Sequence, residues 1–295
     1  MPNLKDLKTR IDSVKSTQKI TSAMKLVAAA KLRRAQEMAE ASRPYSLRMN
    51  DVIASLASKA DPSSAPELLV GRPDVKTHLL VVVSSDKGLC GGFNAFITRA
   101  ARQVIAEKQQ NGQNILIYVV GRKSADALGA EIADKTFQRI EGVQGTNVAF
   151  GDADDIAQKI MTGFEDGTFD SVSMLYNKFV SVIKQDVTHQ SLIPAEVGDV
   201  ADDTAPASGA VATYEYEPDE EEILNALLPR NVATQIFSAL LESSASELAA
   251  RMTAMDNATR NAGDMIDRLT LVYNRTRQAN ITKELIEIIS GAEAL

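Results

Sequence analysis

The chain has 295 residues, of which 44% are hydrophobic and 24% charged, and its net charge is −7. This composition is typical of a soluble globular protein, and only 5% aromatic residues favours helix over a β-sandwich. One cysteine, Cys90, excludes an internal disulfide, and with two histidines it excludes a Cys/His zinc site. No secretion signal and no run approaching roughly 20 apolar residues is found, so we expect neither secretion nor membrane insertion.

The N-terminal stretch predicts one very long helix. Residues 4–59 contain no glycine, and the one proline inside them, Pro44, is where we expect a kink. Some 55 helical residues would span roughly 80 Å, which is too long for an ordinary core helix. The apolar positions recur at spacings of three and four, then slip in phase and resume, with Lys31 where an apolar residue is due. These positions are Leu4, Leu7, Ile11 and Val14, then Ile20, Met24 and Val27, and finally Ala35 and Met38.

This helix is also strongly basic. Residues 1–48 contain eleven Lys and Arg against four acidic residues, a net charge of +7, so the remainder of the chain carries −14. The asymmetry predicts that the helix meets an acidic surface, and a merely solvated basic face is the alternative.

The middle of the chain alternates between strands and helices. A Pro/Ser/Gly-rich linker at 61–76 is followed by expected strands and helices in turn, the last two strands forming a hairpin, and by a mobile acidic loop near 195–213. Parallel strands in an α/β domain are expected from this order. The expected strands are 77–86, 114–121, 169–179 and 185–194, and the expected helices are 93–110, 122–133 and 152–167.

The C-terminal stretch predicts a second long helix over 230–291, with a heptad pattern more regular than the first. Its seam is Leu248, Met252, Met255, Thr259, Ala262, Ile266, Leu269, Tyr273 and Thr276, followed by a second slip and by Ile281, Leu285 and Ile288. Two helices of matching length at opposite ends of the chain can pair antiparallel. The alternative is that each packs on a different partner protein.

The predicted fold class is therefore α/β, with a long antiparallel two-helix coiled coil formed by the N- and C-terminal helices and a central Rossmann-like α/β domain. The predicted division is an N-terminal coiled-coil helix at 1–60, the linker at 61–76, a globular base domain at 77–218, and a C-terminal helical segment at 219–295 that pairs with the first helix.

No motif for catalysis stands out. The turn at 84–94, SSDKGLCGGFN, lies where doubly wound folds bind phosphate, yet it has neither dinucleotide-binding nor P-loop spacing, so we interpret it as a tight strand-to-helix turn needing a glycine with positive φ. His78 and His189 have no Ser or Cys partner nearby in sequence and are interpreted as structural. We expect no catalytic residue, no metal and no cofactor. Nucleic-acid binding is disfavoured, because the basic helix lacks base-reading side chains beside its apolar seam.

Six segments resemble the gamma-subunit family of F-type ATP synthases, whose members form the central rotor shaft, and they occur in that family's order. They are KITSAMKLVAAAKLRRAQ, SRPY, SSDKGLCGGFN, YEYEPDEEEILNALLPR, ASELAARMTAMDNAT and LVYNRTRQANITKELIEIISGAEAL. The resemblance implies a non-catalytic subunit that couples ion flow through a membrane ring to conformational change at nucleotide sites on neighbouring subunits.

The resemblance also implies partners and contact residues. The partners are the alpha and beta subunits of the catalytic hexamer, the small epsilon subunit of the stalk and the membrane c-ring, with no nucleic acid and no lipid insertion. The implied location is the cytoplasmic face of the energy-transducing inner membrane, as a peripheral protein. Contacts with the hexamer are implied for Met24, Lys25, Arg251, Arg277, Gln278 and Thr282, and contacts with the ring for Tyr214 and Glu217.

Two alternatives of other classes stay open on the sequence alone. One is an unrelated coiled-coil scaffold or basic nucleic-acid-binding protein with similar periodicity. The other is an enzyme, which would require a ligand pocket within residues 77–194.

Overall fold

The structure, a computed structural model, describes residues 3–57, 66–143, 148–195 and 220–293. Contacts divide the chain into two compact units, one made of residues 1–29 and 251–295 and the other of residues 30–250. Both long helices contribute to each unit. The domain boundaries drawn above follow the ends of predicted elements, whereas the contacts divide the chain inside the helices, and those boundaries stay a prediction.

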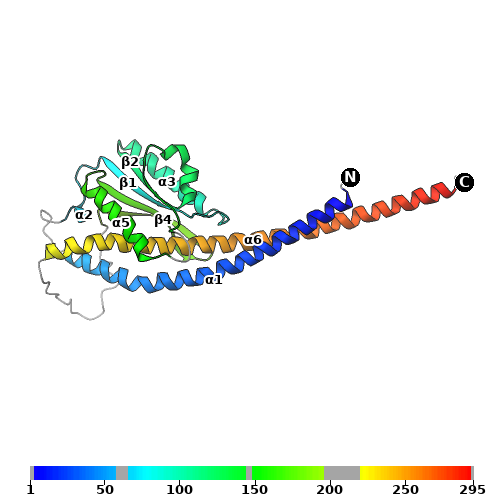
Figure 1. Cartoon of the computed structure of the whole chain (residues 1–295), viewed down its shortest axis with the longest axis horizontal. Coiled ribbons are helices and arrows are strands. Elements are labelled where there is room, and N and C mark those ends of the chain that lie inside the picture. The colour runs from blue at the N-terminus through cyan, green and yellow to red at the C-terminus, as the bar shows by residue number, and fades with distance from the viewer. Residues whose placement is uncertain (1–2, 58–65, 144–147, 196–219, 294–295) are drawn as a thin grey trace. The chain divides into compact units, whose positions relative to one another are not determined.

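The two long helices predicted at the ends of the chain are present (Figure 1). Helix α1 covers Leu4–Ala57 with Pro44 inside it, and helix α6 covers Glu220–Glu293 with Pro229 inside it. In the first unit the N-terminal part of α1 lies antiparallel to the C-terminal half of α6, because residues later in α1 contact residues earlier in α6. The predicted fold class is therefore confirmed.

The buried face of α1 differs from the predicted seam. The phase slip before Ile20 is wrong, because Ile20 and Val27 are 60% and 56% exposed, and Met38 is exposed as well. The spacing of three and four continues unbroken through polar residues. A prediction based only on apolar residues overlooks these polar positions. Its buried and half-buried positions are Leu4, Leu7, Ile11, Val14, Gln18, Thr21, Lys25, Ala28, Leu32, Ala35, Ala39, Ser42, Ser46, Met49, Ile53 and Leu56.

The seam predicted on α6 is buried or half-buried from Leu248 to Thr276, as expected. The positions predicted to resume it are open instead: Ile281, Leu285 and Ile288 are 49%, 54% and 67% exposed. With Thr21 opposite Thr259, the first residue of α1 lies level with about residue 276 of α6. The later apolar residues therefore have no α1 residue beside them.

The second unit contains a five-stranded sheet with the order β3-β2-β1-β4-β5. Strands β1 (Thr77–Val83), β2 (Asn114–Val120), β3 (Thr136–Ile140) and β4 (Ser171–Ser181) are parallel. Strand β5 (Lys184–Ile193) returns antiparallel to β4, as the predicted hairpin requires. This is the Rossmann-like arrangement expected from the order of elements.

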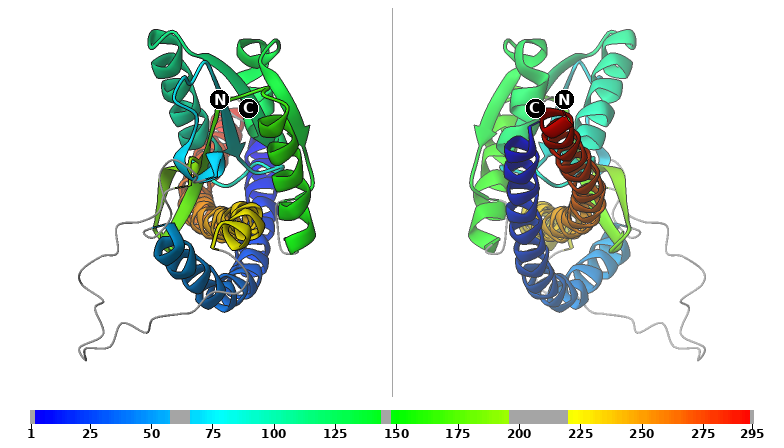
Figure 2. Two further views of the ribbon diagram at one scale, coloured as in Figure 1. Left: turned by 90° about the vertical axis from the view of Figure 1, so that its left-hand side faces the viewer. Right: turned by 90° about the vertical axis from the view of Figure 1, so that its right-hand side faces the viewer.

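Helices cover both faces of this sheet. Alternate residues of β1 point to opposite sides: Leu80 and Val82 join a core with α3 (Phe93–Gln110) and α4 (Arg122–Leu128), whereas Leu79 and Val81 join a core with α5 (Phe150–Glu165) and α6. Figure 2 shows α3 and α5 on opposite sides of the sheet. Because β1 is buried on both faces, it reads in the sequence as a continuous apolar run.

Two short elements were not predicted, and one helix ends early. Strand β3 is a five-residue edge strand with a half-exposed pattern, and α2 (Glu67–Val70) lies inside the predicted linker. The helix expected over 122–133 ends at Leu128 and continues as a 3₁₀ turn over Gly129–Ile132. Gly129 has φ +44°, a conformation that an α-helix does not contain.

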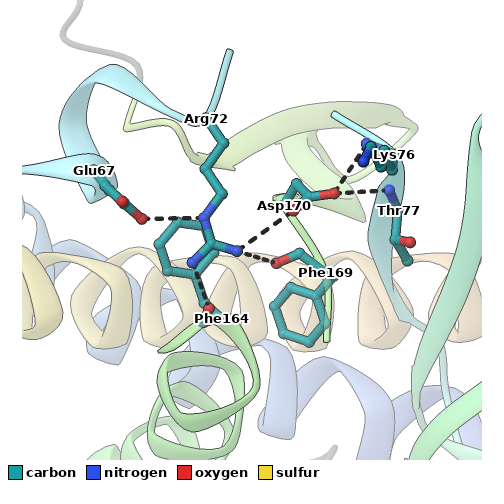
Figure 3. A network of polar contacts seen from close by, with 7 residues as sticks. All are labelled: Glu67, Arg72, Lys76, Thr77, Phe164, Phe169 and Asp170. Atoms are coloured by element: carbon teal, nitrogen blue, oxygen red, sulfur yellow. Dashed lines mark hydrogen bonds and ion pairs between the residues drawn. The ribbon is translucent and has the colours of Figure 1, made fainter. Parts of the chain in front are cut away.

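A polar network ties the start of the sheet to α5 (Figure 3). Asp170 accepts hydrogen bonds from the backbone amides of Lys76 and Thr77 at 2.9 and 3.0 Å. The Arg72 guanidinium lies 3.4 Å from Asp170 and donates to the Phe164 carbonyl at 2.9 Å. Although partial burial acts against ionisation, these hydrogen bonds and the Arg72 charge lower the pKa of Asp170.

Candidate partner-binding surface

Three polar layers interrupt the apolar seam between the two long helices. The hydroxyls of Thr21 and Thr259 lie 2.8 Å apart, and Lys25 Nζ lies 2.6 Å from an Asp256 carboxylate oxygen. In the third layer Gly263 faces Gln18, since a β-carbon built on Gly263 would lie 3.2 Å from the Gln18 side-chain nitrogen. Gln18, Thr21 and Lys25 of α1 thus each have a matching residue on α6.

The Lys25–Asp256 pair is half exposed, with side-chain exposures of 42% and 37%. The hydrogen bond from Lys25 lowers the pKa of Asp256, and the charge of Arg260 adds to the effect. Water and salt screen such a pair, so its main role is to specify which residues face each other. Polar residues inside a coiled-coil seam are known to fix register in this way.

We expect a disulfide to form readily between cysteines placed at Thr21 and Thr259 in a Cys90→Ser background. The two hydroxyl oxygens are already close enough for sulfur atoms at those positions to bond after small shifts. Non-reducing electrophoresis of the full-length chain after mild oxidation, with proteolysis between the cysteines, measures the bridge. The matched control places the second cysteine at Ile266, one heptad along α6. Equal bridging in both pairs would show that the register is not fixed.

The six residues expected to contact the hexamer all lie in the first unit and form two groups. The group of Met24, Lys25 and Arg251 is near the Lys25–Asp256 layer, and all three side chains are partly buried. The group of Arg277, Gln278 and Thr282 begins 21 residues beyond Asp256, roughly 30 Å further along α6. Tyr214 and Glu217, expected to contact the ring, lie outside the described residues.

The second group is exposed and available to a partner. Arg277, Gln278 and Thr282 are exposed on α6, and the Thr282 hydroxyl donates to the Gln278 backbone carbonyl at 3.0 Å. Within the described part of the chain, neither the Arg277 guanidinium nor the Gln278 side-chain amide has a hydrogen-bond or ion-pair partner. Their donors can therefore be given to another molecule without breaking a contact of the fold.

Apolar side chains are exposed beside these polar groups. Leu26, Val27 and Leu271 are 67%, 56% and 68% exposed, and the apolar residues after Thr276 are open as well. Large apolar side chains that a single chain leaves exposed are typical of protein interfaces. Sequence reading missed Gln18, Thr21 and Asp256. The uninterrupted spacing of three and four on α1 would have found Gln18 and Thr21, whereas Asp256 lies off the α6 seam and only the structure identifies it.

The glycine-containing turn after β1 is held by its own hydrogen bonds. Gly91 has φ +58°, which confirms the predicted requirement for a positive φ, and Leu89 has φ +63°. The Asn94 side chain accepts from the Ser85 amide at 3.1 Å and donates to Cys90 Sγ at 3.2 Å. These contacts give the turn a structural role.

Both histidines have serine partners in space that the sequence did not reveal. His78 is buried, and its two ring nitrogens lie 2.6 and 2.7 Å from the hydroxyls of Ser171 and Ser173 on β4. His189 Nε2 lies 2.8 Å from the same Ser173 hydroxyl. Burial, with repulsion from Lys108 and His189, lowers the pKa of His78 to about 3, so this ring is neutral in the fold.

We expect His78 to make the chain less stable in mild acid. Below about pH 6.5 the unfolded chain takes up a proton that the folded His78 does not, so the free energy of unfolding falls as pH falls, by about 1.4 kcal/mol per pH unit. Between pH 6.5 and 5 the contribution is about 2 kcal/mol. Urea unfolding of the full-length chain at both pH values measures it, and His78→Asn should remove this part of the slope. An unchanged slope in His78→Asn would contradict the assignment.

The described residues contain no group of His, Cys, Asp and Glu side chains arranged to hold a metal ion. None of the described helices has the combination of length and hydropathy needed to cross a lipid bilayer.

The chain matches a family model described as ATP synthase over residues 3–295. It is 55% identical over full length, covering 100% of both chains, to the ATP synthase gamma chain of Acidiphilium cryptum. A solved structure of the central stalk and c-ring of Tetrahymena thermophila mitochondrial ATP synthase contains a chain that is 29% identical, with a TM-score of 0.60, covering 81% of this chain and 99% of that one. A chain of the Euglena gracilis mitochondrial ATP synthase shares the fold, with a TM-score of 0.68 and 18% identity over 99% of this chain and 94% of that one.

Proposed function

This chain belongs to the gamma-chain family of ATP synthase, the central-stalk subunits of the rotor, and we propose that its locked helix pair carries rotation to the catalytic hexamer through the two residue groups described above. Ion flow turns the membrane ring, and the shaft changes nucleotide affinity at sites on neighbouring subunits. Because a rotor is a ligand with different affinity for each conformation of those sites, only the differences between its contacts perform work.

The observation that carries this proposal is the polar register between α1 and α6. A two-helix shaft transmits torque only if its helices turn together, and the Thr21–Thr259 and Lys25–Asp256 layers oppose sliding of one helix along the other. The alternative of an unrelated scaffold or nucleic-acid-binding protein is set aside, because the family model covers residues 3–295.

The proposed partners are the alpha and beta subunits, the epsilon subunit and the c-ring, and the proposed location is the cytoplasmic face of the inner membrane. The subunit is proposed to have no active site of its own. In support, the His78 ring and the turn after β1 form hydrogen bonds within the fold. Tyr214 and Glu217 are proposed to face the ring by their match to the family.

The group of Met24, Lys25 and Arg251 is proposed to contact a catalytic subunit in competition with contacts inside the shaft. Lys25 is already bonded to Asp256, so an acidic loop of a catalytic subunit would compete with that carboxylate for the ammonium group. Exchange between two acceptors keeps each contact moderate, which suits a shaft that must leave every subunit it meets. Met24 and Arg251 would contribute apolar and cationic surface to the same encounter.

We expect Arg277→Ala with Gln278→Ala to lower the rate of ATP synthesis several-fold while the complex still assembles. Each substitution removes a donor of hydrogen bonds to a partner, and a bond from the charged Arg277 guanidinium is worth about 1.5–3 kcal/mol. Respiring inverted membrane vesicles give the synthesis rate, and immunoblotting gives the amount of complex. The matched control is Arg268→Ala, an exposed arginine on the same helix. A synthesis rate equal to that of the control would refute the assignment.

The Thr21–Thr259 disulfide gives a second test, in the assembled complex. Since both cysteines belong to one subunit, the oxidised shaft should support ATP synthesis at the rate of the reduced one. Loss of synthesis on oxidation, restored by reduction, would mean that the helices move relative to each other during turnover and would oppose the proposed rigid shaft.

A further inference from the structure

A polar cavity lies in the second unit between α1, α6 and the β4–β5 hairpin. Its volume is about 480 Å³, in the lower part of the range typical of small-molecule sites. Most of its lining residues are polar or charged, and Leu47, Tyr176 and Ala239 are the exceptions, so it suits a hydrophilic ligand better than a lipid. A single water occupies about 30 Å³, so the space exceeds what one bridging water would fill.

Two residues that line this cavity each carry a buried acceptor oxygen with no hydrogen-bond partner in the described part of the chain. Asn231 is 3% exposed, and its side-chain oxygen is buried without a hydrogen bond. The same is true of one carboxylate oxygen of Glu242. Nearly all buried polar atoms in native proteins have a hydrogen-bond partner, so two unsatisfied acceptors on residues that line one cavity point to a donor group there.

Two cations complete the lining. Arg43 reaches the cavity from α1 and Lys178 from β4, and neither makes an ion pair with any described residue. Burial raises the pKa of Glu242, against the opposing charges of Lys178 and Arg43 and a backbone hydrogen bond from Phe179. The three charged groups thus influence one another without direct contact.

We infer that this cavity binds a small zwitterion of the α-amino-acid class, with its carboxylate between Arg43 and Lys178 and its ammonium group at Glu242 and Asn231. A simple anion would satisfy the cations but would meet the Glu242 carboxylate and leave both acceptors unpaired. A simple cation would pair with Glu242 and Asn231 but would be repelled by Arg43 and Lys178. Only a molecule with both an anionic and a cationic group can pair with all four side chains.

The polar side chains on the remaining wall favour an amino acid with an amide. Gln190 Nε2 donates to Gln235 Oε1 at 3.0 Å. The side-chain oxygen of Gln190 and the side-chain NH2 of Gln235 therefore remain for a ligand. A primary amide can pair with both, since it has one acceptor and two donors. L-Glutamine is therefore a suitable probe.

The test is equilibrium dialysis of ¹⁴C-labelled L-glutamine against the purified ATP synthase complex containing this chain. Two competitors dissect the recognition: glutaramate is glutamine without its ammonium group, and 4-aminobutanamide is glutamine without its carboxylate. We expect saturable binding, at least tenfold weaker competition by either analogue, and at least tenfold weaker glutamine binding in Glu242→Gln and in Lys178→Met. The matched control is Glu107→Gln, an exposed carboxylate on α3 of the same unit.

Three results would overturn the inference. Absence of saturable binding would show that the cavity holds water only, or that another subunit fills it. Glutaramate competing as well as glutamine would reveal an anion site without use of Glu242. Unchanged affinity in both Glu242→Gln and Lys178→Met would place the ligand elsewhere. Thermal unfolding of each variant complex confirms that lost binding is not lost folding.

Discussion

Gly121→Ala is expected to prevent folding of the α/β unit, or to lower its free energy of unfolding by at least about 4 kcal/mol. Gly121 follows β2 with φ +94°, and a β-carbon there would lie 2.0 Å from the Ser84 backbone carbonyl oxygen. Neither side of this contact can yield cheaply. The Ser84 amide is hydrogen-bonded to Val120 and the Gly121 amide to Ile140, both at 2.8 Å. The ends of β1, β2 and β3 are therefore fixed around this point.

Gly112→Ala separates the clash from the backbone strain. Gly112 has φ +73°, close to that of Gly121, but a β-carbon there would meet nothing within 4 Å. It should cost only about 1 kcal/mol, the usual penalty of a positive φ for alanine. Urea unfolding of both variants, or the yield of assembled complex, gives the comparison. Equal effects of the two substitutions would show that the close approach at Ser84 has no energetic weight.

Asp170→Ala is expected to lower the free energy of unfolding by about 3 kcal/mol. It leaves the amides of Lys76 and Thr77 without their acceptor and leaves Arg72 without a carboxylate on that side. Arg72 remains bonded to Glu67 and stacked 4.4 Å from the Phe164 ring centroid, so the guanidinium is not left unpaired. The loss is therefore smaller than for a fully buried ion pair.

The pH dependence of this effect gives an independent check. The folded pKa of Asp170 is lowered, so its stabilising effect is present above the unfolded value of about 4 and is lost as pH falls through the folded pKa. The difference between the native chain and Asp170→Ala should accordingly be constant from pH 8 to 5 and shrink below about pH 4. Asp170→Asn, which keeps one acceptor oxygen, should lose less. A difference that grows in acid would contradict the network.

The sequence predicted most of the α/β unit because buried strands and amphipathic helices have distinct apolar periods. The run at β1 and the helix α3 illustrate this, since both are buried where the pattern places them. Strand β3 escaped prediction because an edge strand of five residues with a half-exposed pattern has too few apolar positions to show a period.

The seam of the coiled coil was harder to predict from the sequence than the α/β unit, for a physical reason. Apolar residues mark a seam only where the partner is apolar too, and at Gln18, Thr21 and Lys25 the partner residues are glycine or polar. Ile20 and Val27 were therefore predicted as seam residues, although their side chains are exposed. Such exposed apolar residues on a long helix indicate a binding surface that a single chain cannot bury, and the same applies to the residues after Thr276.

The matched layers between the long helices have a mechanical consequence. A slip of one heptad would bring Lys25 beside Gly263 or Ala249 and leave Asp256 without its cation, so the pair resists shear along its axis. Two rods joined against shear bend and twist as one beam, and such a beam is stiffer than two rods free to slide. Elastic energy stored during a rotary step would then reside in the shaft as a whole, not in a sliding contact between its halves.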